Sequence, residues 1–502
     1  MDSSQDKDVG LKCEVKAFYN HSPDPKSRHQ KWSEFENPIA EDKRVQELGK
    51  AYAVIHRFSK IGNQESDEYG WTTHSIEAQS IRLRNLLDQV FLDYPNWYPD
   101  GSPYAVSPPF QPYVHRWEQI LETLKQQDTT TKMEFQLLRR ELEPRLKQHL
   151  DALKRIREVR TINFDLLWLI LAPGSLMLSR EQGKNCISRL RTIRLVPKSD
   201  AYPAYWELQL DQIDWNGSYS GFETREKEIQ EYGDSILITK LEVYPIEFNP
   251  DVEEIRKQVL ARGAKFEALR GFHVATCTGK KYVKKNSWGG EAEKPISGRV
   301  IIDAYAYFTC QDSPRKPKLI RAKFLNRPSG PPDIPSEDTD DESDISDNQS
   351  SGGEASVERK EDLSPLSDSE RMLAVPRVRG FDLAAKEWCE FDVDDIGEVV
   401  WDETPYENLV LPPGEKELIL AFTDRPRNVK SRFDDFVQHK GEGVIILLCG
   451  PPGVGKTLTA EAVADKSKAP LCHTGREPCA NNQVIRVRRT ELGSKAVTLA
   501  TY

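Results

Sequence analysis

The chain has 502 residues, which is room for about three domains. Lys and Arg number 70 against 80 Asp and Glu, and the resulting formal net charge of −10 argues against a generally basic nucleic-acid binder. The acidity is local, because residues 333–370 hold 14 acids but only two bases, Arg359 and Lys360. That segment therefore carries −12 and the rest of the chain +2, so the net charge says nothing about the ligands of the remainder.

Neither targeting signals nor cysteine patterns point to a secreted or membrane protein. The N-terminus, MDSSQDKDVG, lacks the apolar run of a signal peptide. The most apolar stretch, 164–172, is about half of the roughly 20 residues that span a bilayer. The cysteines form no C-x-x-C pair and so indicate neither a zinc framework nor a disulfide scaffold. We expect a soluble intracellular protein, cytoplasmic or nuclear, with reduced thiols.

The first 110 residues alternate polar patches with aromatics and prolines, which predicts a poorly ordered lead-in with one helix near Ser75–Leu92. Residues 111–327 begin with a helical stripe from Tyr113 to Val159, in which apolar residues recur at spacings of three and four. Thr129–Thr131 separates two runs, and Pro144 is a candidate kink. The stripe fits either a short coiled-coil seam or packing within its own domain, and we favour the packing.

The rest of this second segment predicts an α+β domain. Asp251–Leu269 is an amphipathic helix. Four runs rich in β-branched and aromatic residues predict strands: Arg191–Val196, Tyr205–Leu210, Ser235–Leu241 and Arg299–Phe308. Three aromatic residues near a Gly-containing turn, Trp215, Tyr219 and Phe222, fit a ligand surface or, as we favour, the core.

Residues 328–372 predict a disordered acidic linker, because they carry too few apolar groups to offset chain entropy. Six serines there lie beside acids or before a proline: Ser336, Ser343, Ser346, Ser364, Ser367 and Ser369. This pattern fits either phosphorylation sites or an unmodified, solvated spacer. Basic clusters at 280–285 and 315–323 fit nuclear import, phosphate contacts or plain surface charge. Beyond the linker we expect a second folded domain over 373–474, with a helix over Glu415–Phe422, and an aberrant basic tail over 475–502.

The sharpest motif lies near the C-terminus, where the apolar run Val444–Cys449 predicts a buried strand. The next eight residues fit G-x-x-x-x-G-K-[ST], in which glycines let backbone N–H groups converge on phosphate oxygens. The lysine of the motif places its charge beside the β- and γ-phosphates, and the Thr457 hydroxyl, the only metal position we assign, can ligate Mg²⁺. The predicted nucleotide-binding residues are Gly450, Pro451, Pro452, Gly453, Val454, Gly455, Lys456, Thr457 and Leu458.

The run GPPGVGKTLTAEAVAD resembles the P-loop of AAA-type ATPases. Segments 379–388, 400–401, 409–412 and 433–436 are similar to the region before the P-loop in a large fungal subgroup of this family. That subgroup also carries an N-terminal domain of unknown function, and residues 163–308 of this chain resemble it. The resemblance implies a multidomain protein: an α+β N-terminal domain, the acidic linker and a partial α/β P-loop domain. It also implies ATP and Mg²⁺ as cofactors, and hydrolysis by a hexameric ring that remodels a protein client.

The chain departs from this pattern after the P-loop helix. Residues 458–502 contain no apolar run that ends in paired acids, and no sensor or arginine finger can be matched, so we predict no catalytic residue and a truncated module. The basic stretch 475–489 fits nothing in the family and is either translated intron or a divergent tail. Three functions stay open: an ATPase, a nucleotide-binding protein without hydrolysis, and an interaction scaffold built on 110–310.

Overall fold

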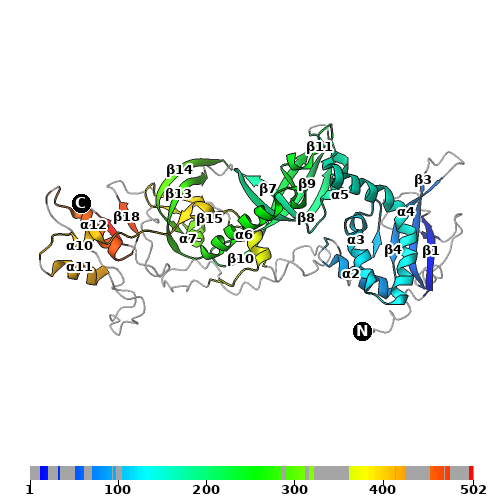
Figure 1. Cartoon of the computed structure of the whole chain (residues 1–502), viewed down its shortest axis with the longest axis horizontal. Coiled ribbons are helices and arrows are strands. Elements are labelled where there is room, and N and C mark those ends of the chain that lie inside the picture. The colour runs from blue at the N-terminus through cyan, green and yellow to red at the C-terminus, as the bar shows by residue number, and fades with distance from the viewer. Residues whose placement is uncertain are drawn as a thin grey trace, which may run out of the picture.

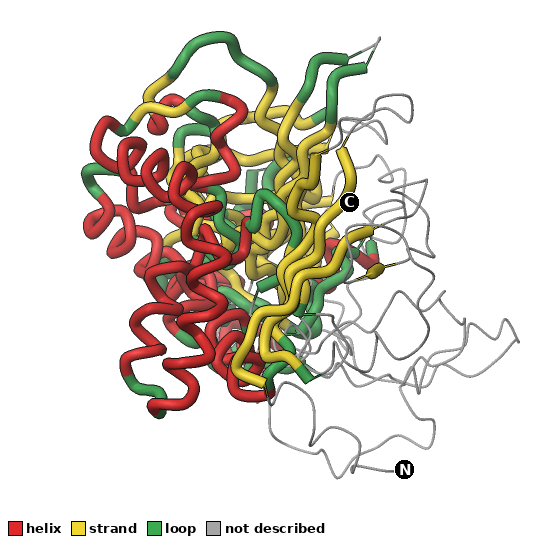
Figure 2. The backbone as a smooth tube through the Cα atoms, turned by 90° about the vertical axis from the view of Figure 1, so that its right-hand side faces the viewer, coloured by secondary structure: helices red, strands yellow, loops and turns green. Residues whose placement is uncertain are grey.

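The fold is known from a computed structural model of the chain (Figure 1). It describes residues 12–20, 32–33, 51–61, 70–92, 94–95, 97, 104–199, 202–284, 290–310, 316–321, 361–412, 414–423, 451, 453–468, 470–474 and 497–500. Along the long axis, an N-terminal sheet with its helices is followed by two further sheets and then by a small C-terminal group of helices (Figure 1). Viewed along that axis, most helices lie on one side of the strands (Figure 2).

A five-stranded sheet in the order β2-β1-β3-β4-β5 occupies the N-terminal region, with β1 and β3 parallel and the other neighbours antiparallel. Its strands are β1 (Lys12–Asn20), β2 (Trp32–Ser33), β3 (Tyr52–Ile61), β4 (Gly70–Ala78) and β5 (Ala105–Val106). The predicted poorly ordered lead-in is therefore wrong for the described part of 1–110. The predicted helix exists as α2 (Ile81–Phe91), capped by Ser80, but its first predicted residues belong to β4. These strands pair with partners far along the chain, which local periodicity does not reveal.

The predicted helical stripe forms α3 (Gln111–Lys125) and α4 (Thr129–Val159). The break falls just before Thr129, because the Asp128 carboxylate accepts hydrogen bonds from the Thr130 and Thr131 amides and caps α4. The helix runs on through Pro144. Its apolar stripe is buried against α2, α3 and the N-terminal sheet, so packing within its own domain is confirmed.

A second, antiparallel sheet has the order β10-β9-β8-β7-β12. Its strands are β7 (Leu176–Glu181), β8 (Lys184–Val196), β9 (Tyr205–Trp215), β10 (Ser220–Gln230) and β12 (Val243–Pro245). Short elements precede or interrupt it: β6 (Thr161–Ile162), α5 (Leu167–Ile170), β11 (Ile236–Leu237) and the 3₁₀ turns Phe164–Leu166, Ile238–Lys240 and Ile246–Phe248. The predicted helix is confirmed as α6 (Val252–Ala268), whereas the strand predicted over Ser235–Leu241 ends at Leu237.

The third sheet unites segments from both sides of the predicted linker, in the order β14-β15-β16-β13-β17 with β13 also paired to β14. Its strands are β13 (His273–Lys284), β14 (Glu291–Ile302), β15 (Arg377–Asp382), β16 (Glu387–Asp392) and β17 (Ile396–Gly397), with the 3₁₀ turn Val393–Asp395 before β17. The strand predicted to reach Phe308 ends at Ile302, because Asp303 caps α7 (Ala304–Thr309). The predicted domain boundary at 373 is wrong, since β15 and β16 complete a sheet that β13 and β14 begin.

The predicted linker is in part a packed segment. Residues 322–360 lie outside the described residues, but α9 (Asp368–Met372) packs on α6, and Leu366 is buried. Gly263 of α6 permits this packing, because a Cβ there would lie 2.0 Å from the Arg371 carbonyl oxygen. Both flanks of 322–360 attach to one hairpin: Ile320 pairs with Phe222, and the amide of Asp362 donates to the Ser218 carbonyl at 2.7 Å. The described residues on both sides of 322–360 therefore belong to the same folded unit.

The C-terminal part consists of α10 (Thr404–Glu407), α11 (Glu415–Thr423), α12 (Lys456–Lys466) and the parallel strands β18 (Leu471–Thr474) and β19 (Val497–Ala500). The helix predicted over Glu415–Phe422 is confirmed as α11. The predicted strand Val444–Cys449 and most of the tail over 475–502 lie outside the described residues. Within the described ranges, no helix combines the length and apolarity needed to cross a membrane.

Candidate nucleotide site

Two glycines of the predicted phosphate loop adopt the left-handed backbone conformation that other residues avoid. Gly453 has φ = 87° and Gly455 has φ = 88°. A Cβ at either position would have no heavy atom within 4 Å, so the requirement for glycine is conformational rather than steric. Gly455 is also the N-cap of α12 and offers no side chain to the helix, which leaves the first amides of α12 without a side-chain cap.

Lys456 and Thr457 occupy the first turn of this helix. The Lys456 Nζ donates a hydrogen bond to the Pro451 carbonyl oxygen at 2.9 Å and so bridges the loop. Thr457 is exposed, as are Val454 and Leu458, with exposed fractions of 57% and 52%. The structure thus brings together, at one helix N-terminus, an ammonium group, a hydroxyl and backbone amides. Of the other predicted site residues, Pro451 is exposed, and Gly450 and Pro452 lie outside the described residues.

Small apolar residues on the opposite face of α12 pack against neighbouring elements. Ala460, Ala462, Val463 and Ala464 are buried, and Tyr406 of α10 packs against Ala462 and Val463. The Tyr406 hydroxyl donates to the Lys416 carbonyl oxygen at 2.7 Å, which ties α10 to α11. The alanine-rich sequence after the motif is therefore a helix with one face close to its neighbours and with its N-terminal turn open to a ligand.

The last turn of α12 is held by charge as well as by packing. Lys466 Nζ lies 2.6 Å from Glu403 Oε2, beside α10. The hydrogen bond to Lys466 lowers the pKa of the Glu403 carboxyl, and the same contact raises the pKa of Lys466. A cation in the last turn also interacts favourably with the helix dipole.

The described groups suit a nucleotide polyphosphate with Mg²⁺. Helix N-terminal amides and a lysine ammonium bind phosphate oxygens, and a hydroxyl oxygen is a ligand that Mg²⁺ accepts. Among the described residues, no cluster of three or more His, Cys, Asp or Glu side chains could hold a metal by itself. A metal ion at the predicted position, the Thr457 hydroxyl, would take further ligands such as phosphate oxygens.

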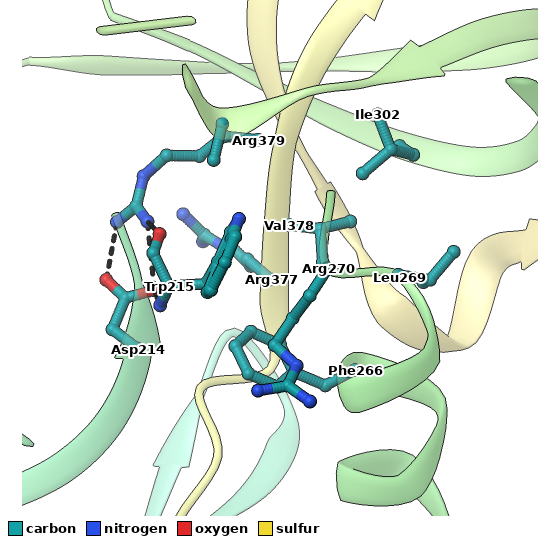
Figure 3. Close-up of a pocket in the computed structure, with 10 residues that line it drawn as sticks. Asp214, Trp215, Phe266, Leu269, Arg270, Ile302, Arg377, Val378 and Arg379 are labelled. Atoms are coloured by element: carbon teal, nitrogen blue, oxygen red, sulfur yellow. Dashed lines mark hydrogen bonds and ion pairs between the residues drawn. The ribbon is translucent and has the colours of Figure 1, made fainter. Parts of the chain in front are cut away.

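The aromatic residues singled out from the sequence lie elsewhere, and the favoured interpretation of them as core residues is confirmed for two. Trp215 and Phe222 are buried, and the Tyr219 ring lies under the Arg321 guanidinium at 4.6 Å. The pocket beside Trp215 (Figure 3) has a volume of about 10 Å³. Such a volume holds one water molecule at most, so it is not a ligand site.

Two residues that help to hold the helix α12 in place, Tyr406 and Asp465, were not predicted from the sequence. Tyr406 fills the groove over α12, and Asp465 forms an ion pair with Arg299 of β14. The signal for Asp465 was present in the sequence, since an acid in the last turn of a helix is unfavourable to the dipole and calls for a partner. The signal for Tyr406 was absent, because a lone aromatic residue does not show what it covers.

Comparison with known families agrees with this geometry. Residues 446–497 match the model described as ATPase family associated with various cellular activities (AAA), and residues 152–250 match a domain of unknown function, DUF7025. A search of curated proteins and of solved structures found no significant match. The match over 446–497 supports, for that segment, the AAA-type ATPase family. The partial AAA match supports, for this chain, an ATP-binding protein of the AAA family that also carries a DUF7025 region.

The folded unit that contains the DUF7025 match is larger than the match. The match ends at residue 250, after β12. The packed structure continues through α6 and the third sheet to β17. We call residues 152–397, as far as they are described, the DUF7025 unit.

Proposed function

We propose that the chain binds ATP together with Mg²⁺ through residues 450–458. The observation that carries the proposal is the pair of left-handed glycines, Gly453 and Gly455, which lead into a helix whose first residue is Lys456. The AAA match over the same segment supports it independently. Amides of the loop and of the first turn of α12 would hold the phosphate chain, and Thr457 would hold Mg²⁺.

Lys456 has to change partners for this function. In the structure its ammonium donates to the Pro451 carbonyl oxygen at 2.9 Å, a bond in which only the donor is charged. A bond to phosphate joins two opposite charges, and the phosphate chain offers several acceptor oxygens, so we expect a bound nucleotide to compete with the carbonyl oxygen for the lysine. The bond to Pro451 then keeps the loop closed around its own lysine until the phosphates replace the carbonyl oxygen.

The resemblance to AAA-type ATPases extends the proposal from nucleotide binding to nucleotide hydrolysis. There, Mg²⁺ supplies charge neutralisation for the transferring phosphoryl group, and a ring of copies would couple hydrolysis to the remodelling of a protein client. Lys456 and the amides of α12 bind and orient the phosphates in that reaction.

A second candidate is nucleotide binding without turnover. Residues 458–502 carry no apolar run that ends in paired acids, and phosphoryl transfer to water needs a residue that orients the water. In this case the chain acts through binding, with the DUF7025 unit as an interaction scaffold.

Titration of the purified full-length chain with a fluorescent ATP analogue and Mg²⁺ tests both candidates. Lys456→Ala is expected to weaken binding by about 10- to 100-fold, the equivalent of one charge-assisted bond. Lys132→Ala is the matched control, because Lys132 of α4 also donates its ammonium to a backbone carbonyl, that of Lys125 at 3.0 Å. Phosphate release measured in parallel separates the candidates: Lys456-dependent turnover supports the ATPase, and binding alone supports the second. Absence of binding by the wild type would refute the proposal.

A further inference from the structure

The P-loop helix α12 carries an acid where a helix disfavours one. Asp465 lies in the last turn, at the negative end of the helix dipole. Arg299 of β14 donates two parallel hydrogen bonds to the Asp465 carboxylate, from Nη2 to Oδ2 at 3.0 Å and from Nη1 to Oδ1. The planar guanidinium matches the planar carboxylate, a geometry that adds direction as well as attraction.

This ion pair is more sheltered than an ordinary surface pair. The Asp465 side chain is 16% exposed and that of Arg299 32%, so water screens the pair only in part. The guanidinium also lies over the ring of Trp401, 4.8 Å from its centre, and this contact restricts the arginine further. Because packing already restricts both side chains, forming this ion pair costs less side-chain entropy than pairing two mobile surface charges would.

Arg299 stands at the point where the chain leaves the DUF7025 unit. It is opposite Thr276 in the β13–β14 pairing, and the Thr276 hydroxyl donates to the Glu398 carbonyl oxygen at 3.0 Å. Glu398 directly follows β17, and Trp401 lies in the segment between β17 and α10. One arginine therefore contacts both the connecting segment and the P-loop helix.

We propose that Arg299 is a positioning residue for the nucleotide site and couples the DUF7025 unit to nucleotide binding. The inference rests on the proposed function. An eleven-residue helix about 16 Å long moves as one body, so holding Asp465 fixes the direction in which the N-terminal amides and Lys456 point. Linkage is reciprocal: if the ion pair favours nucleotide binding, nucleotide binding strengthens the ion pair.

The test uses the full-length chain with four variants. Arg299→Gln and Asp465→Asn each remove one partner, and Arg299→Asp combined with Asp465→Arg restores the pair with its charges exchanged. The last arrangement also places a cation at the favourable end of the helix. Arg194→Gln is the matched control, since Arg194 of β8 donates two bonds to the Glu207 carboxylate on a remote exposed surface.

Two readouts are recorded on every variant: the dissociation constant of a fluorescent ATP analogue with Mg²⁺, and amide hydrogen exchange of residues 456–466 without nucleotide. Each single variant should weaken nucleotide binding about three- to tenfold and speed exchange in α12, whereas the exchanged pair and the control should stay within twofold of the wild type. A contact that only stabilises the helix would speed exchange in α12 in the single variants but leave their affinity for the nucleotide unchanged.

The outcomes separate this inference from the proposed function. A wild type that binds nucleotide, with Arg299→Gln unchanged in affinity, overturns the coupling and leaves the nucleotide site standing. A wild type that binds no nucleotide overturns the nucleotide site and the coupling together. Unchanged exchange in α12 on loss of Arg299 overturns the positioning role whatever the affinity.

Discussion

Arg379 of β15 donates two hydrogen bonds to the carboxylate of Asp214 in β9, from Nη1 to Oδ1 at 2.9 Å and from Nη2 to Oδ2 at 2.8 Å (Figure 3). The pair joins the second sheet to the third, and Asp214 is fully buried. Burial opposes the charge on Arg379, but the nearby Asp214 and Glu390 outweigh it and raise the pKa of the guanidinium. Through this contact, residues that follow 322–360 are locked to strands that precede it.

Loss of this contact should destabilise the DUF7025 unit strongly. Arg379→Ala leaves the Asp214 carboxylate buried without its partner, so the free energy of unfolding should fall by about 3–5 kcal/mol. Urea unfolding followed by circular dichroism measures the change. Arg194→Ala, which removes an exposed arginine, is the control and should cost less than about 1 kcal/mol. A loss below about 1 kcal/mol for Arg379→Ala would show that the pair does not join the sheets.

His115 should make stability depend on pH. Burial lowers the pKa of this imidazole to about 4, although its Nε2–H donates to the Trp168 carbonyl at 2.7 Å. The Tyr94 hydroxyl donates to Nδ1 at 2.8 Å, which fixes the neutral tautomer. The unfolded chain takes up a proton near pH 6.5 and the folded chain only near pH 4, so stability falls as the pH drops through that window.

The full effect of a shift from 6.5 to about 4 is roughly 3 kcal/mol. Burial also lowers the pKa values of His56, His74 and His149, so the contribution of His115 is the difference between the wild type and His115→Gln in urea unfolding at intervals from pH 7 to 5. His115→Gln should be less stable at pH 7 and show a flatter dependence. An equal slope in both proteins would mean that the pKa of His115 is the same in the folded and the unfolded chain.

Gly455→Ala should distort the loop through strain in its own backbone, not through a clash with another residue. A side chain at φ = 88° costs about 1–2 kcal/mol, because Cβ meets its own backbone, so the loop should shift and ATP-analogue binding should weaken about five- to thirtyfold. Gly70→Ala is the control, because a Cβ at Gly70 also meets no heavy atom and its backbone is not left-handed. Equal affinities for the two variants would show that the left-handed conformation is not needed.

Replacement of 322–360 by a short Gly/Ser segment should leave stability unchanged. The flanks are attached independently, Ile320 to Phe222 and Asp362 to Ser218, so the fold does not depend on the intervening sequence for their placement. The thermal midpoint should stay within about 2 °C. A replacement extended through residue 372 removes buried Leu366 and α9 and should lower the midpoint clearly. Equal midpoints for the two replacements would contradict the packing of α9 on α6.

Features encoded in short segments could be predicted well. The apolar stripe of α4 and the amphipathic pattern of α6 recur every three to four residues, so both helices follow from local spacing. The phosphate loop follows from the spacing of Gly450, Gly455 and Lys456, because its chemistry depends on neighbours in sequence. The core role of Trp215 and Phe222 followed from the general preference of aromatic side chains for burial.

Features that depend on distant partners could not be predicted. Residues 377–397 have composition and motifs that fit the start of a new domain, yet they complete a sheet with 273–302. Strand pairing depends on which strand edges and buried faces fit together in the folded protein. The order of the residues along the chain does not show which strands become neighbours. The position of Asp465 in the last turn of a helix calls for a partner, but the choice of Arg299, 166 residues earlier in the chain, could not be predicted.

The sequence by itself determined the longer helices α3, α4 and α6, the spacing of the phosphate loop and the concentration of acid in 333–370, because periodicity, glycine spacing and charge are local properties. Only the tertiary structure decided that 361–397 belongs to the unit before it, and that a β14 arginine holds the P-loop helix. The physical reason is that hydrogen-bonded strand edges and buried ion pairs form between groups that only the folded chain brings together.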